Sequence, residues 1–221
     1  LRESPIENFY VGAAEAEQVA APLKKLLARL DRQPIPLAPQ TALCSCEGQN
    51  VVESMEVTQG KLCMGFVTPI TIRDKEFPAM QVFNILFGGG MTSLLFTNIR
   101  EKLSLCYDIS SGYHSAKGIV AVSAGIDCDK REVVTKQVLD QLEICKQSTF
   151  TSEQLEAAKQ AVISGLQGVH DSPGAIESYY STSALSGARL TLQEYRAAVE
   201  ATTAEEVARA ARSVSLHSSF I

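Results

Sequence analysis

Residues 83–107, FNILFGGGMTSLLFTNIREKLSLCY, carry the strongest structural signal in the chain. An apolar helical pattern that begins near Asp74, a side chain able to cap a helix, ends there at three consecutive glycines. A second helical pattern follows over residues 92–103. Its apolar stripe consists of Leu95, Ile99 and Leu103. The stretch therefore predicts two helices around a glycine turn, with a strand beginning at Cys106.

Strand-like patterns lie on both sides of this helical region. Residues 51–57 and 61–67 flank a Thr-Gln-Gly turn, which predicts an antiparallel hairpin. Residues 106–113 and 118–126 predict a second strand pair, because apolar side chains alternate along the second of these runs. Residues 215–221 predict a last strand.

From residue 129 onward the pattern is almost wholly helical. Capping boxes of the form T-x-x-E/Q predict three helix starts, at Thr151/Gln154, Thr191/Glu194 and Thr202/Glu205. Strands and helices come in groups and do not alternate strictly. This order predicts an α+β fold, in which helices pack on one face of a mostly antiparallel sheet.

The beginning of the chain is set apart from this body. A strand-like run at residues 8–11 and a helical pattern over residues 13–30 precede a Pro-rich linker near residues 31–42. The length of 221 residues suffices for one substantial core, and we expect a single α+β domain over residues 1–221. Because the chain starts at Leu1 and stops in a β-prone run, we expect a fragment of a longer protein.

Composition excludes several classes of function. The chain is 45% apolar and 20% charged, which is typical of a globular protein. A net charge of −5 gives no basic surface for nucleic acid or for anionic membranes. The sequence has no run of the ~18 apolar residues that a spanning helix needs, and no leader pattern. We therefore expect neither nucleic acid nor a membrane as a partner.

The cysteines favour a reducing environment. Six are present, but three of them lie in apolar periodic segments, where cysteine usually acts as a small buried hydrophobe. A cytoplasmic location is therefore expected. Cys44 and Cys46 form a Cys-Ser-Cys pair without a second ligand pair at zinc-site spacing. A pair of loop thiols is the favoured interpretation, and a redox or metal-binding pair is the alternative.

Familiar catalytic patterns are missing from the sequence. No two of His114, His170 and His217 have the spacing that places zinc ligands on one helix face, and no H-x-x-E-H occurs. The sequence contains no G-x-S-x-G elbow, and the triple glycine lacks the G-K-[ST] ending of a phosphate loop. Metal catalysis by this chain alone is therefore not expected.

Two consecutive motifs within residues 83–107 carry a family resemblance. From Asn84 the chain is similar to an N-x-x-L-G-G-G-x-S-S-x-L-F run, and from Arg100 to Tyr107 it is similar to R-E-K-x-G-L-A-Y. Ser104 and Cys106 replace the usual Gly and Ala of the second motif, both by small residues. The stretch resembles the pitrilysin/insulinase-like (inverzincin) zinc metallopeptidases, which include the mitochondrial processing peptidases. The resemblance is to the C-terminal half that lacks the zinc motif.

The resemblance implies a fold and a site. Members look like two similar α+β halves that close as a clamshell over an unfolded peptide, with zinc held by H-x-x-E-H in one half. This chain would hold no metal, and zinc would lie in the missing half of the same polypeptide or in a partner subunit. Arg100 and Tyr107 would be catalytic, contacting the substrate carbonyl and the transition state. Gly88, Gly89 and Gly90 would line the substrate chamber.

Simpler interpretations of these residues stand beside that implication. Arg100, Glu101 and Lys102 are also typical of a solvated helix end, and three glycines suffice for a helix C-cap and turn. The preferred function is the substrate-binding half of a metalloendopeptidase, inactive when isolated. The alternatives are a non-catalytic scaffold or partner subunit of a heterodimeric peptidase, and a stand-alone module that binds peptides along an edge strand.

Overall fold

The computed structural model describes residues 2–36, 46–188 and 190–221. Backbone contacts divide the chain into two compact units. The N-terminal unit consists of Leu1–Gln40 and Gly165–Arg189, and the sheet unit consists of Thr41–Ser164 and Leu190–Ile221. Residues 31–36 are irregular, as expected for a linker, whereas residues 37–42 and Cys44 lie outside the described residues. The expectation of a single domain over residues 1–221 stays a prediction.

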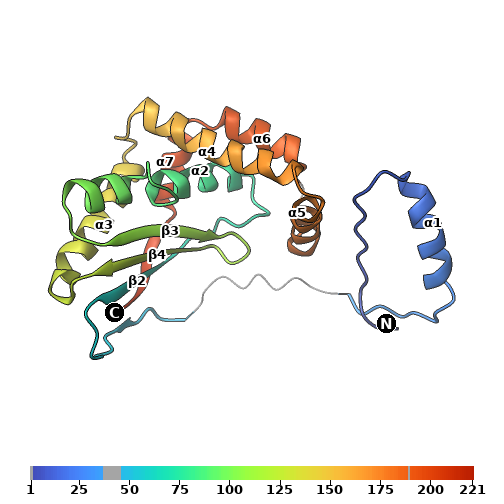
Figure 1. Ribbon diagram of the computed structural model, residues 1–221, viewed down its shortest axis with the longest axis horizontal. Helices are drawn as coiled ribbons and strands as arrows, with labels where there is room; N and C mark the ends of the chain where they lie inside the picture. The colour runs from blue at the N-terminus through green and yellow to red at the C-terminus, as the bar shows by residue number, and fades with distance from the viewer. Residues whose placement is uncertain (1, 37–45, 189) are drawn as a thin grey trace. The chain divides into compact units, whose positions relative to one another are not determined.

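The sheet unit is built on a five-stranded sheet of order β1-β5-β2-β4-β3 (Figure 1). The strands are β1 (Asn50–Val51), β2 (Gly60–Val67), β3 (Asp108–His114), β4 (Ile119–Ile126) and β5 (Ser215–Phe220). Three of the four pairings are antiparallel, and only β1 runs parallel to its neighbour β5. The predicted pair of strands after Cys106 and the predicted last strand are therefore confirmed.

Helices cover one face of this sheet, as Figure 1 shows. They are α2 (Phe77–Phe87), α3 (Arg131–Lys146), the first part of α4 (Ser152–His170), α6 (Leu192–Ala201) and α7 (Ala204–Arg212). Along β2, Leu62, Met64 and Phe66 are buried beneath the helices. Lys61 and Cys63 are exposed, as the two-residue period of a strand requires. The predicted α+β class, with helices on one face of the sheet, is confirmed.

The predicted hairpin between residues 51–57 and 61–67 is wrong. Only Asn50 and Val51 form a strand in the first run, and they pair with β5 instead of β2. The reason is long-range competition, because β5 occupies the edge of β2 that the hairpin would have used. The apolar side chains of Val52, Met55 and Val57 consequently stay exposed.

The N-terminal unit contains α1 (Ala16–Leu27), the last part of α4 and α5 (Pro173–Ser186). The predicted helix near residues 13–30 is confirmed with shorter bounds, whereas the predicted strand at residues 8–11 does not form. Within the described residues, no neighbouring strand supplies the main-chain hydrogen bonds that this run would need. Across the described ranges, no helix combines the length and the apolarity required to cross a membrane.

Helix starts follow the predicted capping boxes at two of three places. Thr151/Gln154 and Thr191/Glu194 exchange their hydrogen bonds as predicted. The third box is formed by Thr203 and Glu206, one residue later than predicted, because the Thr202 hydroxyl donates to Ala198 O at the end of α6 instead.

The predicted cap at Asp74 is also wrong. Its carboxylate accepts hydrogen bonds from the backbone and hydroxyl of Thr71, both at 2.7 Å, and so stabilises the turn before α2. The N-cap position of α2 is occupied by Glu76, whose side chain makes no capping bond.

Candidate functional site

The three glycines of the first motif lie at the end of α2. Gly88 is the C-cap residue, and its N–H donates to Asn84 O at 3.0 Å. Its carbonyl accepts a 2.8 Å hydrogen bond from Ser111 N on β3. A Cβ at Gly88 would lie 2.7 Å from Leu95 Cδ1 and 2.8 Å from Ser111 Cβ. Packing between α2, β3 and the following helix therefore requires glycine here. The C-cap position of Gly88 confirms the helix-cap interpretation for this residue.

Replacing Gly88 by Ala is expected to lower the free energy of unfolding by about 1–3 kcal/mol, because the added methyl group overpacks a closed contact. Urea unfolding followed by circular dichroism measures the change. Gly90→Ala is the matched control, since a Cβ there meets no described atom within 4 Å. Equal stability of the two variants would contradict this packing role. Gly89 is crowded by Ile85, so Gly90 is the cleaner control.

The helix after the glycines is η1 (Leu95–Lys102), a π-helix. Leu95 and Ile99 are buried, as the predicted stripe requires, whereas Leu103 is exposed and falls outside the helix. π-helical turns are rare and occur frequently at functional sites. The second motif begins at Arg100, in the last turn of η1.

Arg100 projects from the last turn of η1 and is held by several contacts. Its Nε donates to Tyr107 O at 2.9 Å, and its Nη1 donates to Glu101 Oε1 at 2.8 Å. The guanidinium carbon lies 4.7 Å from the centroid of the Phe96 ring. Nη2 makes no hydrogen bond to any described residue. Ser104 completes the connection with a φ of 50°, in the left-handed region favoured by the glycine that the motif usually carries.

Tyr107 directly precedes β3 and is held beside the end of β4. Its N–H donates to Gly125 O at 2.8 Å. Its phenol donates to Asp127 Oδ1 at 2.7 Å, and Asp127 forms an ion pair with Lys130 at 2.7 Å. The side chain of Tyr107 remains about half exposed. Backbone pairing and one directed hydrogen bond therefore hold the phenol at the surface of the sheet unit.

The charges of this group keep the phenol protonated. The hydrogen bond to Asp127 and the negative charge of that carboxylate raise the pKa of Tyr107 above its usual value. Lys130 and the phenol together lower the pKa of Asp127, and Asp127 raises the pKa of Lys130 in turn. At neutral pH Tyr107 is a hydrogen-bond donor, and Asp127 is a carboxylate.

Replacing Asp127 by Asn is expected to shift the ionisation of Tyr107 to lower pH, towards the usual pKa of about 10, because a neutral amide no longer disfavours the phenolate. NMR titration of the tyrosine ring carbons measures the shift. Tyr113 is the internal control, since its phenol donates to Ile70 O and burial raises its pKa independently of Asp127. An unchanged Tyr107 titration would contradict the hydrogen bond described above.

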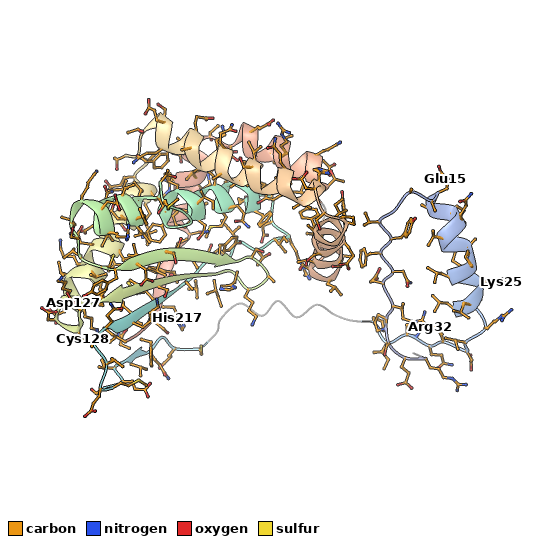
Figure 2. The ribbon with its side chains drawn as sticks, viewed as in Figure 1. Glu15, Lys25, Arg32, Asp127, Cys128 and His217 are labelled. Atoms are coloured by element: carbon orange, nitrogen blue, oxygen red, sulfur yellow. The ribbon has the colours of Figure 1, made fainter. Side chains whose placement is uncertain are left out.

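Arg100 and Tyr107 share one open cavity of about 480 Å³. Its walls consist of Arg100, Glu101, Ser104, Leu105, Cys106, Tyr107, Asp127 and Lys130. The structure therefore brings the two predicted catalytic residues together, whereas the glycines at 88–90 do not line this cavity. Asp127 and Lys130 were not predicted as part of the site. The register of the predicted strand pair was the available signal, because it pairs Asp108 with Gly125 and so places Tyr107 beside the end of β4. Asp127, labelled in Figure 2, directly follows β4.

The side chains that could bind a metal lie apart from one another in the part of the chain that the structure describes. Across residues 2–36, 46–188 and 190–221, no three His, Cys, Asp or Glu side chains form a group that could hold a metal ion. His114 ends β3 and His170 ends α4, while His217 lies on β5 with Nε2 2.8 Å from Cys46 O. Cys63, Cys106, Cys128 and Cys145 form no disulfide with a described residue, and burial raises the pKa of Cys145 to about 12.

Comparison with known proteins identifies a family for this chain. Residues 4–162 match the family model described as "Peptidase M16 inactive domain". A protein of Bacillus subtilis named "Probable inactive metalloprotease YmfF" is 26% identical over 220 residues, covering 100% of this chain and 52% of that protein. An "Uncharacterized zinc protease" of Rickettsia bellii is 27% identical, covering 73% of this chain and 39% of that protein. The chain thus spans about half the length of the Bacillus relative, and less of the Rickettsia relative.

Solved structures show the same fold. A conserved protein from Enterococcus faecalis superposes with a TM-score of 0.75 at 27% identity, covering 90% of this chain and 48% of that one. A peptidase M16 inactive domain from Pseudomonas fluorescens gives a TM-score of 0.76 at 19% identity, covering 94% of this chain and 51% of that one. The second likeness concerns the fold alone. The resemblance carried by the two motifs is confirmed: this chain belongs to the peptidase M16 inactive domain family.

Proposed function

We propose that this chain is the substrate-binding, non-zinc half of a zinc metalloendopeptidase that cleaves peptides in a clamshell chamber. The observation that carries the proposal is that Arg100 and Tyr107 both line one cavity. The names of the relatives support the class of enzyme, since several are called zinc proteases. The missing half, or a partner subunit, would carry the zinc.

The two side chains suit the stabilisation of a developing oxyanion. A guanidinium stays charged and donates hydrogen bonds in a fixed fork, while a phenol donates one directed O–H. The bond from Arg100 Nε to Tyr107 O ties the two residues together, so Nη2 and the phenol would approach one carbonyl as a unit. The guanidinium is already fixed by its own hydrogen bonds and would stabilise the transition state with little reorganisation, whereas the phenol would first have to leave Asp127.

Asp127 defines the resting position of the phenol. To reach a substrate carbonyl, Tyr107 would exchange its hydrogen bond to Asp127 for one to the substrate. The ion pair with Lys130 would then keep Asp127 satisfied, so the exchange leaves no charge unpaired. Gly88, Gly89 and Gly90 complete the proposal as part of the chamber wall contributed by the end of α2.

Zinc, when bound to the other half, activates the attacking water and polarises the scissile carbonyl. Residues of this chain would hold and orient the peptide but would not supply that activation. The isolated chain is therefore expected to be inactive. We also propose a cytoplasmic location, supported by Cys63, Cys106, Cys128 and Cys145, which form no disulfide with a described residue.

A cleavage assay on an unstructured peptide tests the proposal. The assay contains added zinc and is run on this chain alone and on the longer protein, with bound metal quantified in both. Cleavage and one equivalent of zinc only in the longer protein would support a divided site. Cleavage by this chain alone would refute it.

A non-catalytic scaffold or partner subunit is the second candidate. It is favoured by the Bacillus relative, which matches this chain over its whole length and is named a probable inactive metalloprotease. In that case the longer protein neither binds zinc nor cleaves the peptide, and activity returns only with a zinc-bearing partner. An H-x-x-E-H motif elsewhere in the longer protein would favour the first candidate.

A further inference from the structure

The cavity of Arg100 and Tyr107, which we call the site cavity, has a neighbour at the same end of the sheet. This second cavity has a volume of about 460 Å³, within the usual range for a ligand pocket. Much of its lining is apolar and comes from two segments that are far apart in the sequence, namely Val52, Met55, Val57, Phe220 and Ile221. Glu53, Lys61 and Arg131 add charged side chains. We call this second cavity the apolar groove.

The apolar side chains of the groove are largely exposed. Val52, Met55 and Val57 are each 57–64% exposed. They stay exposed because β5 occupies the edge of β2 on which their segment could have paired. Exposed apolar side chains that are clustered and rimmed by charged ones are typical of a surface that binds a ligand or a partner. The groove therefore offers apolar area that a bound molecule would cover.

One turn of 3-10 helix, η2 (Cys128–Lys130), contributes to both cavities. Asp127 and Lys130 line the site cavity. Cys128 and Arg131 line the apolar groove. Side chains three residues apart lie on the same side of a 3-10 helix, which explains this alternation. Figure 2 labels Asp127 and Cys128 next to each other, so the two cavities are separated by little more than this turn.

A row of three paired residues also leads from the site cavity to the groove. Asp108 of β3 and Lys61 of β2 both pair with Gly125 of β4, from opposite sides. Lys61 and Asp108 form an ion pair at 2.9 Å across that glycine, where a Cβ would collide with the Asp108 carboxylate. Asp108 directly follows Tyr107, and Lys61 lines the groove. Because neighbouring strands lie ~4.8 Å apart, the row spans about 10 Å, which an extended peptide covers with about three residues.

We propose that the apolar groove is a specificity subsite, which receives an apolar side chain of the peptide substrate three or four residues from the cleaved bond. This inference rests on the proposed function, because Arg100 and Tyr107 would hold the carbonyl of that bond in the site cavity. From there an extended peptide would pass over the ion pair of Lys61 and Asp108 and place a large aliphatic side chain in the groove. Covering apolar surface on both molecules would favour such substrates.

A peptide substrate is a better occupant of the groove than a second copy of this chain. The groove is a hollow lined by five apolar residues, which suits one or two side chains of a ligand. A stable interface between proteins usually involves about 20–30 residues on each side. The groove also lies within about 10 Å of the site cavity, a distance that one extended peptide can span.

A single leucine moved along an otherwise polar, unstructured peptide tests the subsite. The longer protein is assayed on peptides that differ only in the position of that leucine, and mass spectrometry identifies the cleaved bond. The kcat/KM is expected to rise at least about 10-fold when the leucine lies three or four residues from that bond, as contacts in an apolar pocket usually provide. In the Val57→Ser variant the rise should shrink to less than about 3-fold. No rise at these positions, or the same rise in the variant, would overturn the proposal.

Val133→Ser is the matched control for Val57→Ser. Val133 lies on α3, is 41% exposed and lines neither the site cavity nor the groove. This variant should show the same preference for leucine as the parent, and both variants should keep the Tm of the parent because both side chains are largely in contact with water. Loss of the preference in both variants would overturn the proposal. Met55→Ser repeats the test at a second exposed position of the groove.

Peptide binding by this chain separates the inference from the proposed function. Fluorescence anisotropy of an end-labelled peptide gives a Kd that needs neither cleavage nor zinc. The leucine peptide is expected to bind about 10-fold more tightly than the same peptide with serine in its place, and Val57→Ser should remove the difference. That result with a longer protein that never cleaves would refute the proposed function but support the groove as a peptide site. Equal binding of the two peptides to the parent chain would overturn the inference even if the longer protein cleaves. A dimeric mass that Val57→Ser reduces to that of one chain would overturn it in favour of a second copy.

Discussion

If the longer protein is the peptidase proposed above, Tyr107→Phe should lower its kcat by about 10- to 1000-fold. Removal of one oxyanion donor from a preorganised site costs about 10²–10³ in kcat, and the lower limit allows for a donor that remains half exposed. If the phenol acts only in the transition state, kcat and kcat/KM should fall equally, with little change in KM. Folding should be preserved, because the ring stays and only an exposed hydrogen bond to Asp127 is lost. Steady-state kinetics on an unstructured peptide give both constants.

Tyr180→Phe is the matched control for this kinetic prediction. Tyr180 lies on α5, is also partly exposed and does not line the cavity of Arg100 and Tyr107. Turnover equal to that of the parent is expected for this variant. If Tyr107→Phe also retained full turnover, Tyr107 would be removed from the mechanism. A rise in KM alone would instead indicate a role in ground-state binding.

Phe83→Ala is expected to lower the free energy of unfolding by about 3–5 kcal/mol. Phe83 is fully buried and stacks on Phe87 with ring centroids 5.4 Å apart. Phe87 in turn meets Phe66 of β2 edge to face at 6.4 Å. The substitution therefore opens a cavity between α2 and the sheet, and its cost is a large part of the about 5–15 kcal/mol that usually stabilises a domain.

Urea unfolding of the parent and of the variant gives this difference. Met91→Ala is the control, since Met91 belongs to the same stretch of sequence but is 77% exposed. A change within about 0.5 kcal/mol is expected for that surface position. If Phe83→Ala lowered the free energy of unfolding by as little as Met91→Ala, α2 would not be anchored to the sheet by its aromatic face.

Much of the fold was predictable wherever neighbouring segments pair with each other. β3 and β4 are consecutive along the chain, so their alternation and short connection were sufficient. The strand expected over residues 51–57 failed because its place beside β2 is taken by β5, about 150 residues later in the sequence. Local sequence patterns indicate the tendency to form a strand, but they do not indicate with which other strand it pairs. The displaced third capping box differs by one residue, because Thr202 and Thr203 offer the same hydroxyl.

Only those residues of the candidate site that belong to a motif could be predicted from the sequence. The spacing of Arg100 and Tyr107 suggested a pair, and the structure shows that the pair is joined through Nε of the arginine and the carbonyl of the tyrosine. Asp127 and Lys130 belong to neither motif, so they could be recognised as part of the site only once the register of β3 and β4 was known. The glycines illustrate a different difficulty. One residue type serves helix capping, close packing and chamber lining alike, and for Gly88 close packing already suffices.

The position of β5 bears on how this polypeptide is made. A ribosome adds residues from the N-terminus, so β2 and β4 can pair well before residues 215–220 have been synthesised. During that interval one edge of β2 has no partner, although it lies inside the finished sheet. An exposed inner strand can recruit strands from neighbouring nascent chains. Chains released before β5 is made would therefore be more prone to aggregate than chains that contain it, and chaperones would be needed most while α6 and α7 are synthesised.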